Sequence, residues 1–298
     1  HRFYKRMDNI MSNFKDFISS GGGGGADKLN LLTPASGLKV IVRASTTYTP
    51  SADCTAVVTC IGAGGGGGSI QMNQSFVSSG GAAGAVCQSE LSLTSGTTYT
   101  ITIGAGGNAS GVGGNTTFVG SDIADMAANG GAGGGYVPVG GTTTKAGGTA
   151  SGGNIANHTG GSAIIVATNG SGSYGGAACG FFETGKNSAS STSANMPNGA
   201  GMDIPPTDLI PQLAPDILGG SRGVSSTLSQ GGTGDFGCGG GSGYIYVYSS
   251  SNSNYAYGGT GGIGGGGGGS YAWNNRSGNS ASGSGGKGGS GMVILEFV

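Results

Sequence analysis

Charged residues are scarce in this chain of 298 residues: Asp, Glu, Lys and Arg together make up 8% of it, against about 25% in an average soluble protein. The formal net charge is −1, so the sequence has neither a basic patch for nucleic acid nor an acidic tail. Apolar runs are short as well, and none approaches the roughly 20 residues that a membrane-spanning helix needs. We therefore expect no nucleic-acid partner and no membrane span.

Metal-binding and cross-linking residues are also few. The two histidines and five cysteines show no CxxC spacing or other ligand pattern, so we expect no metal site. An odd number of cysteines gives no complete disulfide framework, and Cys60, inside an apolar segment, is typical of a small buried hydrophobic residue. In an oxidising environment two pairings stay open, Cys54 with Cys60 or Cys179 with Cys238.

Catalytic patterns are missing in the same way. Nucleophilic catalysis needs a base beside the nucleophile, and His158, the only internal histidine, lies in a glycine-rich stretch. The acidic residues are scattered and form no carboxylate pair. Residues 180–187 (GFFETGKN) nearly match a phosphate-binding loop, but Asn187 stands where Ser or Thr would hold magnesium. The sequence therefore predicts that the protein is not an enzyme and binds no cofactor.

Glycine is what the chain has in abundance, with 72 residues in 298. The glycines come in runs or near-runs, at Gly21–Gly25, Gly64–Gly68, Gly130–Gly135 and Gly258–Gly269. Each costs about 0.5–1 kcal/mol of stability relative to alanine, chiefly through backbone entropy, so an ordered chain must offset this by dense backbone hydrogen bonding. Disorder is the alternative, but it usually accompanies high net charge and few β-branched or aromatic residues, unlike the pattern here.

Packed extended glycine helices meet this requirement. There is no strict Gly-X-Y period and there are only eight prolines, which excludes collagen. A glycine helix like polyproline II has three residues per turn and no internal hydrogen bonds, so its N–H and C=O groups must pair with neighbouring helices or water. We expect such polyglycine II helices around Gly64–Gly68, Gly130–Gly135 and Gly262–Gly269, bonded to one another in a bundle.

β-Branched and aromatic segments alternate with the glycine runs and predict strands. Thr94–Thr97 is a plausible hairpin turn between two of them. The last strand must pair with an earlier one, which closes residues 21–298 into one domain. The predicted fold class is all-β: a β-framework with a bundle of polyglycine II helices, plus a short N-terminal amphipathic α-helix. The expected strands are Leu38–Ala44, Ala56–Ile61, Ser89–Leu93, Thr98–Ile103, Thr116–Val119 and Met292–Val298.

Residues 1–20 differ from everything after them and form a separate N-terminal segment. Their apolar residues are spaced by four, three, four and three, the heptad spacing of a helix with one apolar stripe. A free helix of this length is marginal in water, so the stripe must be buried. It either lies on its own domain or, as we favour, mediates docking or oligomerisation. The stripe consists of Phe3, Met7, Ile10, Phe14 and Phe17.

Four stretches carry a resemblance to a known family. Their order is a strand, a glycine run, a second strand with GAGG, and a closing strand. Together, over roughly residues 55–298, they resemble the glycine-rich domain at the ends of bacteriophage tail fibres and tail-tip proteins. The stretches are VVTCIGAGGGGG (57–68), SGTTYTITIGAGG (95–107), GNTTF (114–118) and GKGGSGMVILEF (286–297).

This resemblance implies a β-framework that supports polyglycine II helices, with receptor-binding loops at the distal end. It implies a virion location at a tail-fibre tip, or an extracellular fibre, and a bacterial surface receptor, protein or glycan, as partner. A glycine-rich region of some animal receptor kinases looks similar, so the fold alone does not imply a phage protein. The chain departs from the family in its heptad start and in the proline-rich segment 203–215.

Recognition must lie in the side chains that the glycine scaffold presents, because binding residues concentrate on loops. Tyr, Trp, Asn and Ser are typical of rigid yet adaptable binding surfaces. We therefore predict a receptor-binding adhesin whose loops 203–217, 244–257 and 271–276 gather at one end. The alternatives are that the aromatics only cap the bundle, or that the protein is a structural fibre or virion surface subunit. The predicted receptor-binding residues are Tyr271, Trp273, Asn274, Arg276, Tyr255 and Tyr257.

Overall fold

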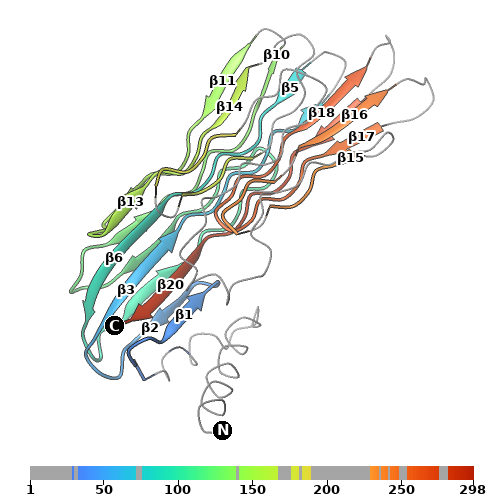
Figure 1. Cartoon of the computed structure of the whole chain (residues 1–298). Coiled ribbons are helices and arrows are strands. Elements are labelled where there is room, and N and C mark those ends of the chain that lie inside the picture. Colours follow the sequence, from blue (N-terminus) through green and yellow to red (C-terminus); the bar gives the residue numbers. More distant parts are fainter. Residues whose placement is uncertain are drawn as a thin grey trace, which may run out of the picture.

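The protein is essentially all-β, with several sheets and almost no helix among the described residues. Figure 1 shows sheets at the two ends of an elongated molecule, joined by extended segments that carry no arrows. The C-terminus lies at the lower end in this view. The computed structural model describes residues 29, 33–71, 76–138, 141–166, 176–180, 183–188, 229–234, 236–240, 242–247, 254–274 and 281–298.

Two five-stranded antiparallel sheets form the lower end, which we call the sandwich (Figure 1). In spatial order, the first sheet contains β1 (Lys39–Val42), β20 (Met292–Phe297), β3 (Cys54–Ile61), β6 (Val86–Leu93) and β13 (Ala156–His158). The second contains β12 (Ala150–Ser151), β9 (Met126–Ala128), β8 (Thr116–Val119), β7 (Tyr99–Thr102) and β2 (Thr46–Tyr48).

Apolar side chains from the facing surfaces of the two sheets form the main core. Val58 and Leu295 from the first sheet are fully buried together with Phe118 from the second. Tyr99 stacks on Phe118, with ring centroids 5.5 Å apart. The other face of the first sheet is covered too, since Ile294 belongs to a second buried cluster. Burial on both faces explains why the first four residues of β20, 292–295, are all apolar.

The strand predictions for the sandwich are confirmed within a few residues at each boundary. The terminal strand β20 pairs with both β1 and β3, as a closing strand must. The predicted turn is also present, because the Thr97 N–H donates to the Thr94 carbonyl at 3.1 Å. Gly96 has a φ of 78° there, which glycine adopts without steric cost.

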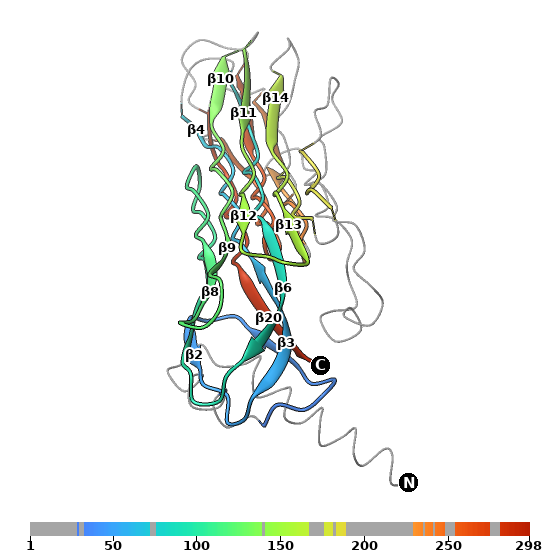
Figure 2. The same ribbon diagram turned by 90° about the vertical axis from the view of Figure 1, so that its left-hand side faces the viewer.

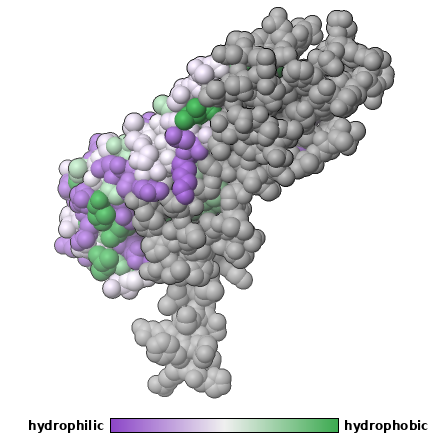
Figure 3. Space-filling view, turned by 45° about the horizontal axis from the view of Figure 1, so that its top comes forward, coloured by the Kyte–Doolittle hydropathy of each residue, from purple (hydrophilic) through white to green (hydrophobic). Residues whose placement is uncertain are grey.

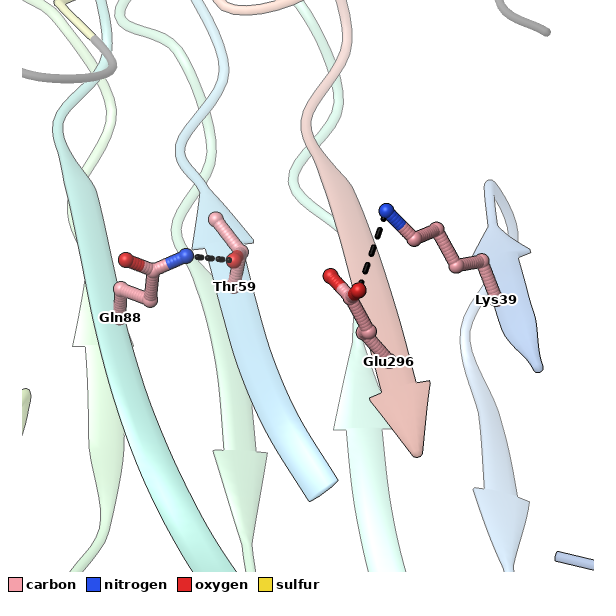
Figure 4. Close-up of polar contacts among 4 residues, drawn as sticks. All are labelled: Lys39, Thr59, Gln88 and Glu296. Carbon is pink, nitrogen blue, oxygen red and sulfur yellow. Dashed lines mark hydrogen bonds and ion pairs between the residues drawn. The ribbon is translucent and has the colours of Figure 1, made fainter. Parts of the chain in front are cut away.

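Polar side chains join neighbouring strands on the face of the first sheet opposite the main core, as Figure 4 shows. Lys39 and Glu296 face each other across β1 and β20, with Lys39 Nζ 3.0 Å from Glu296 Oε1. Gln88 Nε2 donates to Thr59 Oγ1 at 3.1 Å across β6 and β3. Such cross-strand pairs each contribute roughly 0.2–1 kcal/mol and help to fix the register.

Glycine-rich segments continue the sandwich strands beyond the ends of the sheets, toward the upper end of Figures 1 and 2. Residues 62–69 continue β3, 129–135 continue β9, and 104–108 continue β7. Sheets that face each other are normally about 10 Å apart because side chains fill the space. Without side chains the two layers approach until their backbones bond, and we call this part the glycine lattice.

The hydrogen bonds of the lattice repeat every three residues. Along 62–68, successive N–H groups donate to three different neighbouring segments in turn, and the fourth returns to the first neighbour. The N–H groups of Gly62, Gly65 and Gly68 donate to the carbonyls of Ala85, Ala82 and Ser79, respectively. Those of Ala63 and Gly66 donate to Gly114 and Gly111, and those of Gly64 and Gly67 donate to Gly289 and Gly286. All these N···O distances lie between 2.7 and 3.1 Å.

The same segment accepts hydrogen bonds from three further segments, so six segments surround it. Two of its neighbours, 79–85 and 286–289, adjoin the partner strands of β3 in the first sheet. Others adjoin strands of the second sheet, so the bonds now cross between the layers. The residues that donate to carbonyls of 62–68 are Gly107 and Ser110 from the first further segment, Gly131 and Gly134 from the second, and Gly267 from the third.

Glycine is required in the lattice by close packing rather than by an unusual backbone angle. A Cβ atom added at Gly64 or Gly66 would come within 3.0 Å of a carbonyl oxygen, of Gly265 or Asn108 respectively. Contacts of this kind are too short for any real Cβ atom, so the neighbouring backbone would have to move. The hydrogen that replaces Cβ is therefore what allows the segments to approach.

Outer segments of the lattice follow a simple rule, X-Gly-Gly-X, in which only X is exposed. Each X is three residues from the next, and neither of the two glycines between them is exposed. In inner segments such as 62–68 and 265–269, every residue is buried. The exposed X residues include Ala105 and Asn108, Val112 and Asn115, Ala146 and Thr149, Gln230 and Thr233, Tyr257 and Thr260, and Ser284, Lys287 and Ser290.

Short strands resume at the upper end (Figures 1 and 2). Two antiparallel pairs are β5 (Phe76–Ser78) with β10 (Tyr136–Pro138) and β11 (Thr142–Lys145) with β14 (Ala163–Val166). One parallel pair is β16 (Gly243–Val247) with β18 (Ser270–Asn274). A four-stranded sheet has the order β15 (Ser229–Gln230), β17 (Asn254–Tyr257), β19 (Ala281–Ser284) and β4 (Ile70–Gln71).

Two sequence predictions are corrected by the structure. The stretch Gly262–Gly269 is not one extended segment, because Gly265 N–H donates to the Gly262 carbonyl and Gly264 has a φ of 74°. The chain therefore turns there and runs back. Cys54 and Cys60 cannot pair, because six residues of one β-strand separate them by about 20 Å, whereas a disulfide needs Cα atoms within about 7 Å.

Candidate receptor-binding surface

The sheet β15–β17–β19–β4 carries two of the predicted binding residues, Tyr255 and Tyr257, on β17. They are two residues apart, so they lie on the same face of the strand. Their side chains are 45% and 42% exposed, and their rings lie 24° from parallel with centroids 6.4 Å apart. We call this pair the tyrosine platform.

Ala256, which lies between the two tyrosines in sequence and points to the opposite face of β17, is fully buried and fixes the strand under the platform. On the next strand, a Cβ atom at Gly283 would collide with the side chain of Ser270. Ser270 is held in turn by Ser78, since its N–H donates to Ser78 Oγ at 2.8 Å and Ser78 Oγ donates to its carbonyl. The sheet therefore packs tightly against β18 and β5.

Three further predicted residues lie on strand β18, which pairs in parallel with β16. The pairing sets Tyr271 opposite Tyr244, Trp273 opposite Tyr246, and Asn274 opposite Val247. Strand β18 runs beside β17 and β19, so the aromatic residues of both sheets belong to the same end of the molecule (Figure 1). Arg276 and the segment 203–217 lie outside the described residues, as does the predicted N-terminal helix 1–20 with Phe3, Met7, Ile10, Phe14 and Phe17.

A repeat of 27 residues, not predicted from the sequence, builds this end. Strand pairing matches Gln230 with Tyr257 and Tyr257 with Ser284, a constant offset (257 − 230 and 284 − 257). Each strand runs directly into a similar heptapeptide. The three copies are GGTGDFG (231–237), GGTGGIG (258–264) and GGKGGSG (285–291). The signal was present in the sequence but is hard to see where glycine is so frequent.

The repeat arranges exposed side chains in rows. Gln230, Tyr257 and Ser284 form one row, and Thr233, Thr260 and Lys287 form the next, three residues further along each copy. The carbonyl of each X residue in the second and third copies accepts a bond from a glycine of the preceding copy. These are Gly231 to Tyr257 at 2.8 Å, Gly234 to Thr260 at 2.7 Å, Gly258 to Ser284 at 2.9 Å and Gly261 to Lys287 at 2.8 Å. The rows are thus fixed by the backbone.

We name the distal face as the tyrosine platform together with the polar residues beside it. Ser282 is paired in register with Tyr255. Only Lys287 is charged among these residues. Figure 3 shows mainly a different part of the described surface, where hydrophilic and neutral residues are mixed with a few hydrophobic ones. The distal face consists of Gln230, Thr233, Tyr255, Tyr257, Thr260, Ser282, Ser284 and Lys287.

The residues that make up the distal face include no cysteine, histidine, aspartate or glutamate. In the part of the chain that the structure describes, no three His, Cys, Asp or Glu residues lie close enough to hold a metal ion. Cys60 and Cys87 stand opposite each other on β3 and β6, and their mutual hydrogen bond together with burial raises the pKa of Cys60. Burial also raises the pKa of Cys179. The thiols of Cys60 and Cys179 are thus less acidic than an ordinary cysteine, whereas the hydrogen bond with Cys60 lowers the pKa of Cys87.

Comparison with known proteins identifies the type of domain. The model of a family described as a glycine-rich domain matches residues 41–298, which include the sandwich apart from the first two residues of β1, the described lattice and the distal face. A comparison with curated proteins gives no match. In the described ranges, no helix is long and apolar enough to cross a membrane.

Proposed function

We propose, on the premise that the chain belongs to the glycine-rich domain family, that it is a non-enzymatic adhesin of the phage tail-fibre type. In this proposal the glycine lattice is a rigid support and the upper end binds a receptor on a bacterial surface. Its location is then a virion tail-fibre tip or an extracellular fibre. Docking or self-association through residues 1–20 completes the proposal and stays a prediction.

The support is rigid if its segments are polyglycine II helices, as we infer. A helix with three residues per turn directs successive N–H groups to neighbours spaced around it, and the fourth repeats the first. The donors along 62–68 follow this three-residue cycle. The X-Gly-Gly-X burial pattern follows from it as well, because one residue in three faces outward on an outer helix. Six neighbours around one segment correspond to hexagonal packing of such helices.

One observation carries the adhesin proposal: three neighbouring strands that each carry tyrosine, β16, β17 and β18, gather at the end opposite the sandwich, whereas the sandwich tyrosines Tyr48 and Tyr99 are buried. Strands β16, β17 and β18 lie at the upper end in Figure 1, while β1, β3 and β20 lie at the lower end. The lattice between them offers mainly small residues to solvent, as its exposed X positions show. Aromatic side chains are typical anchors of interfaces, and their concentration at one end favours recognition there.

The substitution Trp273→Ala tests this proposal. The readout is binding of the labelled full chain to a panel of bacterial strains, scored by flow cytometry. We expect binding to at least one strain, weakened more than about tenfold by the substitution, which corresponds to roughly 1.4 kcal/mol. The melting temperature of the variant should stay close to that of the parent chain, because an anchor for a ligand contributes little to folding.

The opposite result supports a structural subunit instead. If Trp273→Ala lowers the melting temperature strongly while binding per folded molecule is unchanged, the tryptophan is a packing residue of the upper end. If the parent chain binds no strain in the panel, the adhesin proposal fails, and a fibre or virion surface subunit without a receptor becomes the better account.

A further inference from the structure

We infer that the distal face binds a polysaccharide of uncharged sugars, with the tyrosine platform stacking on the sugar rings. This inference rests on the proposed adhesin function and specifies its receptor class. It depends on the described side chains of β15, β17 and β19 and on the glycine segments that follow them.

The tyrosine platform has the shape and chemistry that a sugar ring requires. A pyranose ring presents a face of C–H groups that packs on an aromatic ring, and it carries hydroxyls around its edge. Tyr255 and Tyr257 offer two nearly parallel rings, 6.4 Å apart and almost half exposed. Tyrosine combines an apolar ring with a polar hydroxyl, so it suits a surface that binds both parts of a sugar.

Hydrogen-bonding side chains flank the platform at fixed positions. Gln230 lies beside Tyr257 on one side and Ser284 on the other, while Ser282 lies beside Tyr255. The glutamine amide both donates and accepts, and so does each serine hydroxyl. Sugar hydroxyls have the same dual character, so these neighbours can bind them in either sense without a change of protonation.

The charge of the distal face argues against other classes of ligand. Lys287 is its only charged residue, whereas nucleic acids are bound mainly by several cations that neutralise phosphates. Protein partners are usually anchored by aromatic or arginine side chains in well-packed pockets that exclude water. The distal face instead presents two open rings surrounded by hydroxyl and amide groups, which favours an uncharged, hydroxyl-rich ligand.

The repeat suits a chain of sugars rather than a single one. The row Thr233, Thr260 and Lys287 follows the row Gln230, Tyr257 and Ser284 after three residues of each copy. At the rise of about 3.1 Å per residue of a polyglycine II helix, the two rows are about 9 Å apart. An extended polysaccharide that stacks on the platform therefore reaches the threonine row with a following sugar.

The experiment applies the full chain to an array of purified bacterial polysaccharides, both neutral and acidic, and measures binding by fluorescence. We expect at least one neutral polysaccharide to bind, with binding weakened at least tenfold by Tyr257→Ala and by Tyr255→Ala. Tyr257→Phe should retain most of the binding, since the ring remains. The matched control is Tyr136→Ala, which removes another tyrosine of the upper end, 64% exposed, from a different sheet.

Treated cells separate this inference from the adhesin proposal. Periodate cleaves the vicinal diols of sugars, and protease removes surface proteins. Binding that is lost after periodate but survives protease supports the inference. Binding that survives periodate but is lost after protease overturns it, while the adhesin proposal stands. Equal loss with Tyr136→Ala, or binding only to acidic polysaccharides, also overturns it. If no cells bind at all, the adhesin proposal itself fails.

Discussion

The sandwich and the glycine lattice are built from the same chain segments but packed in different ways. Strand β3 has β6 and β20 beside it and a layer of side chains between it and the second sheet. Its continuation, residues 62–69, keeps the segments next to β6 and β20 and gains direct backbone bonds to the second layer. The difference lies only in the side chains, whose removal converts two sheets into a bundle.

This comparison locates stability in different groups of atoms. In the sandwich, each fully buried large apolar side chain contributes about 1.5–3 kcal/mol. In the lattice, each backbone hydrogen bond contributes a net 0.5–1.5 kcal/mol or so, against an entropy cost of about 0.5–1 kcal/mol per glycine. The lattice is therefore stable only if nearly all of its bonds form. The lattice should therefore tolerate substitution of its buried glycines poorly, whereas the sandwich should tolerate exchanges between apolar side chains of similar size.

The largest effect should come from Gly265→Val. A Cβ atom at this position would come within 3.0 Å of the Cys238 carbonyl, and no side-chain rotation relieves a clash with backbone. The neighbouring segment must move, which breaks its bonds to other segments. We expect a loss of more than about 4–5 kcal/mol in the free energy of unfolding, which is exceptional for one substitution. Urea denaturation followed by circular dichroism measures it.

Thr260→Val is the matched control, since it places the same residue at an exposed X position of the same repeat. Surface changes of this kind usually alter stability by no more than about 0.5 kcal/mol. Similar losses in the two variants would contradict the division of the lattice into inward glycines and outward X positions.

A smaller loss should follow from Phe118→Ala in the sandwich. The ring is fully buried and stacked on Tyr99, and removing a buried phenylalanine typically costs about 3–5 kcal/mol. Phe118→Leu keeps most of the volume and should cost less than about 1.5 kcal/mol, as hydrophobic exchanges of similar size do. The same denaturation measurement applies. If the leucine variant is as unstable as the alanine variant, the sandwich core depends on exact fit in the same way as the lattice.

Sequence pattern sufficed for six of the ten sandwich strands, because β-branched runs such as 56–61 and 292–298 carry their strand signal locally. The other four, β2, β9, β12 and β13, are only two or three residues long and were not predicted. It also indicated that glycine segments bond to neighbours, since extended glycine helices have no internal bonds. The aromatic residues of the candidate surface were found from composition alone: Tyr255 and Tyr257 are exposed. The prediction that they bind a receptor stays a prediction.

Long-range relations could not be predicted in the same way. The turn at Gly264 stands at the start of the glycine run 264–269, directly after Ile263, and glycine is so frequent here that it does not mark the turn. The opposition of Cys60 and Cys87 depends on the register of β3 with β6, which the thiols themselves do not determine. Gln230 and Ser284 gained a role only when the 27-residue offset set them beside Tyr257. Each of these features depends on pairing between distant segments.

The smallest expected effect is a pH dependence of the melting temperature. It tests whether a charged side chain stabilises the sandwich, in contrast to a lattice that is bonded through its backbone. The Tyr99 hydroxyl donates to Asp122 Oδ2 at 2.9 Å, and hydrogen bonds from Thr94 and Tyr99 lower the pKa of Asp122. A lowered carboxyl pKa contributes stability above the ordinary aspartate value of 3.8, and this contribution is lost as the pH falls through the pKa of the folded state. Melting temperatures of the parent chain and Asp122→Asn should therefore differ slightly at pH 6 and converge as the pH falls below 3.8 and through the lowered pKa of the folded state. Tyr99→Phe, which removes one donor, should reduce the difference.

A constant difference in melting temperature across this pH range would show that Asp122 contributes no proton-linked stability. The sandwich would then be as insensitive to pH as a lattice bonded through its backbone.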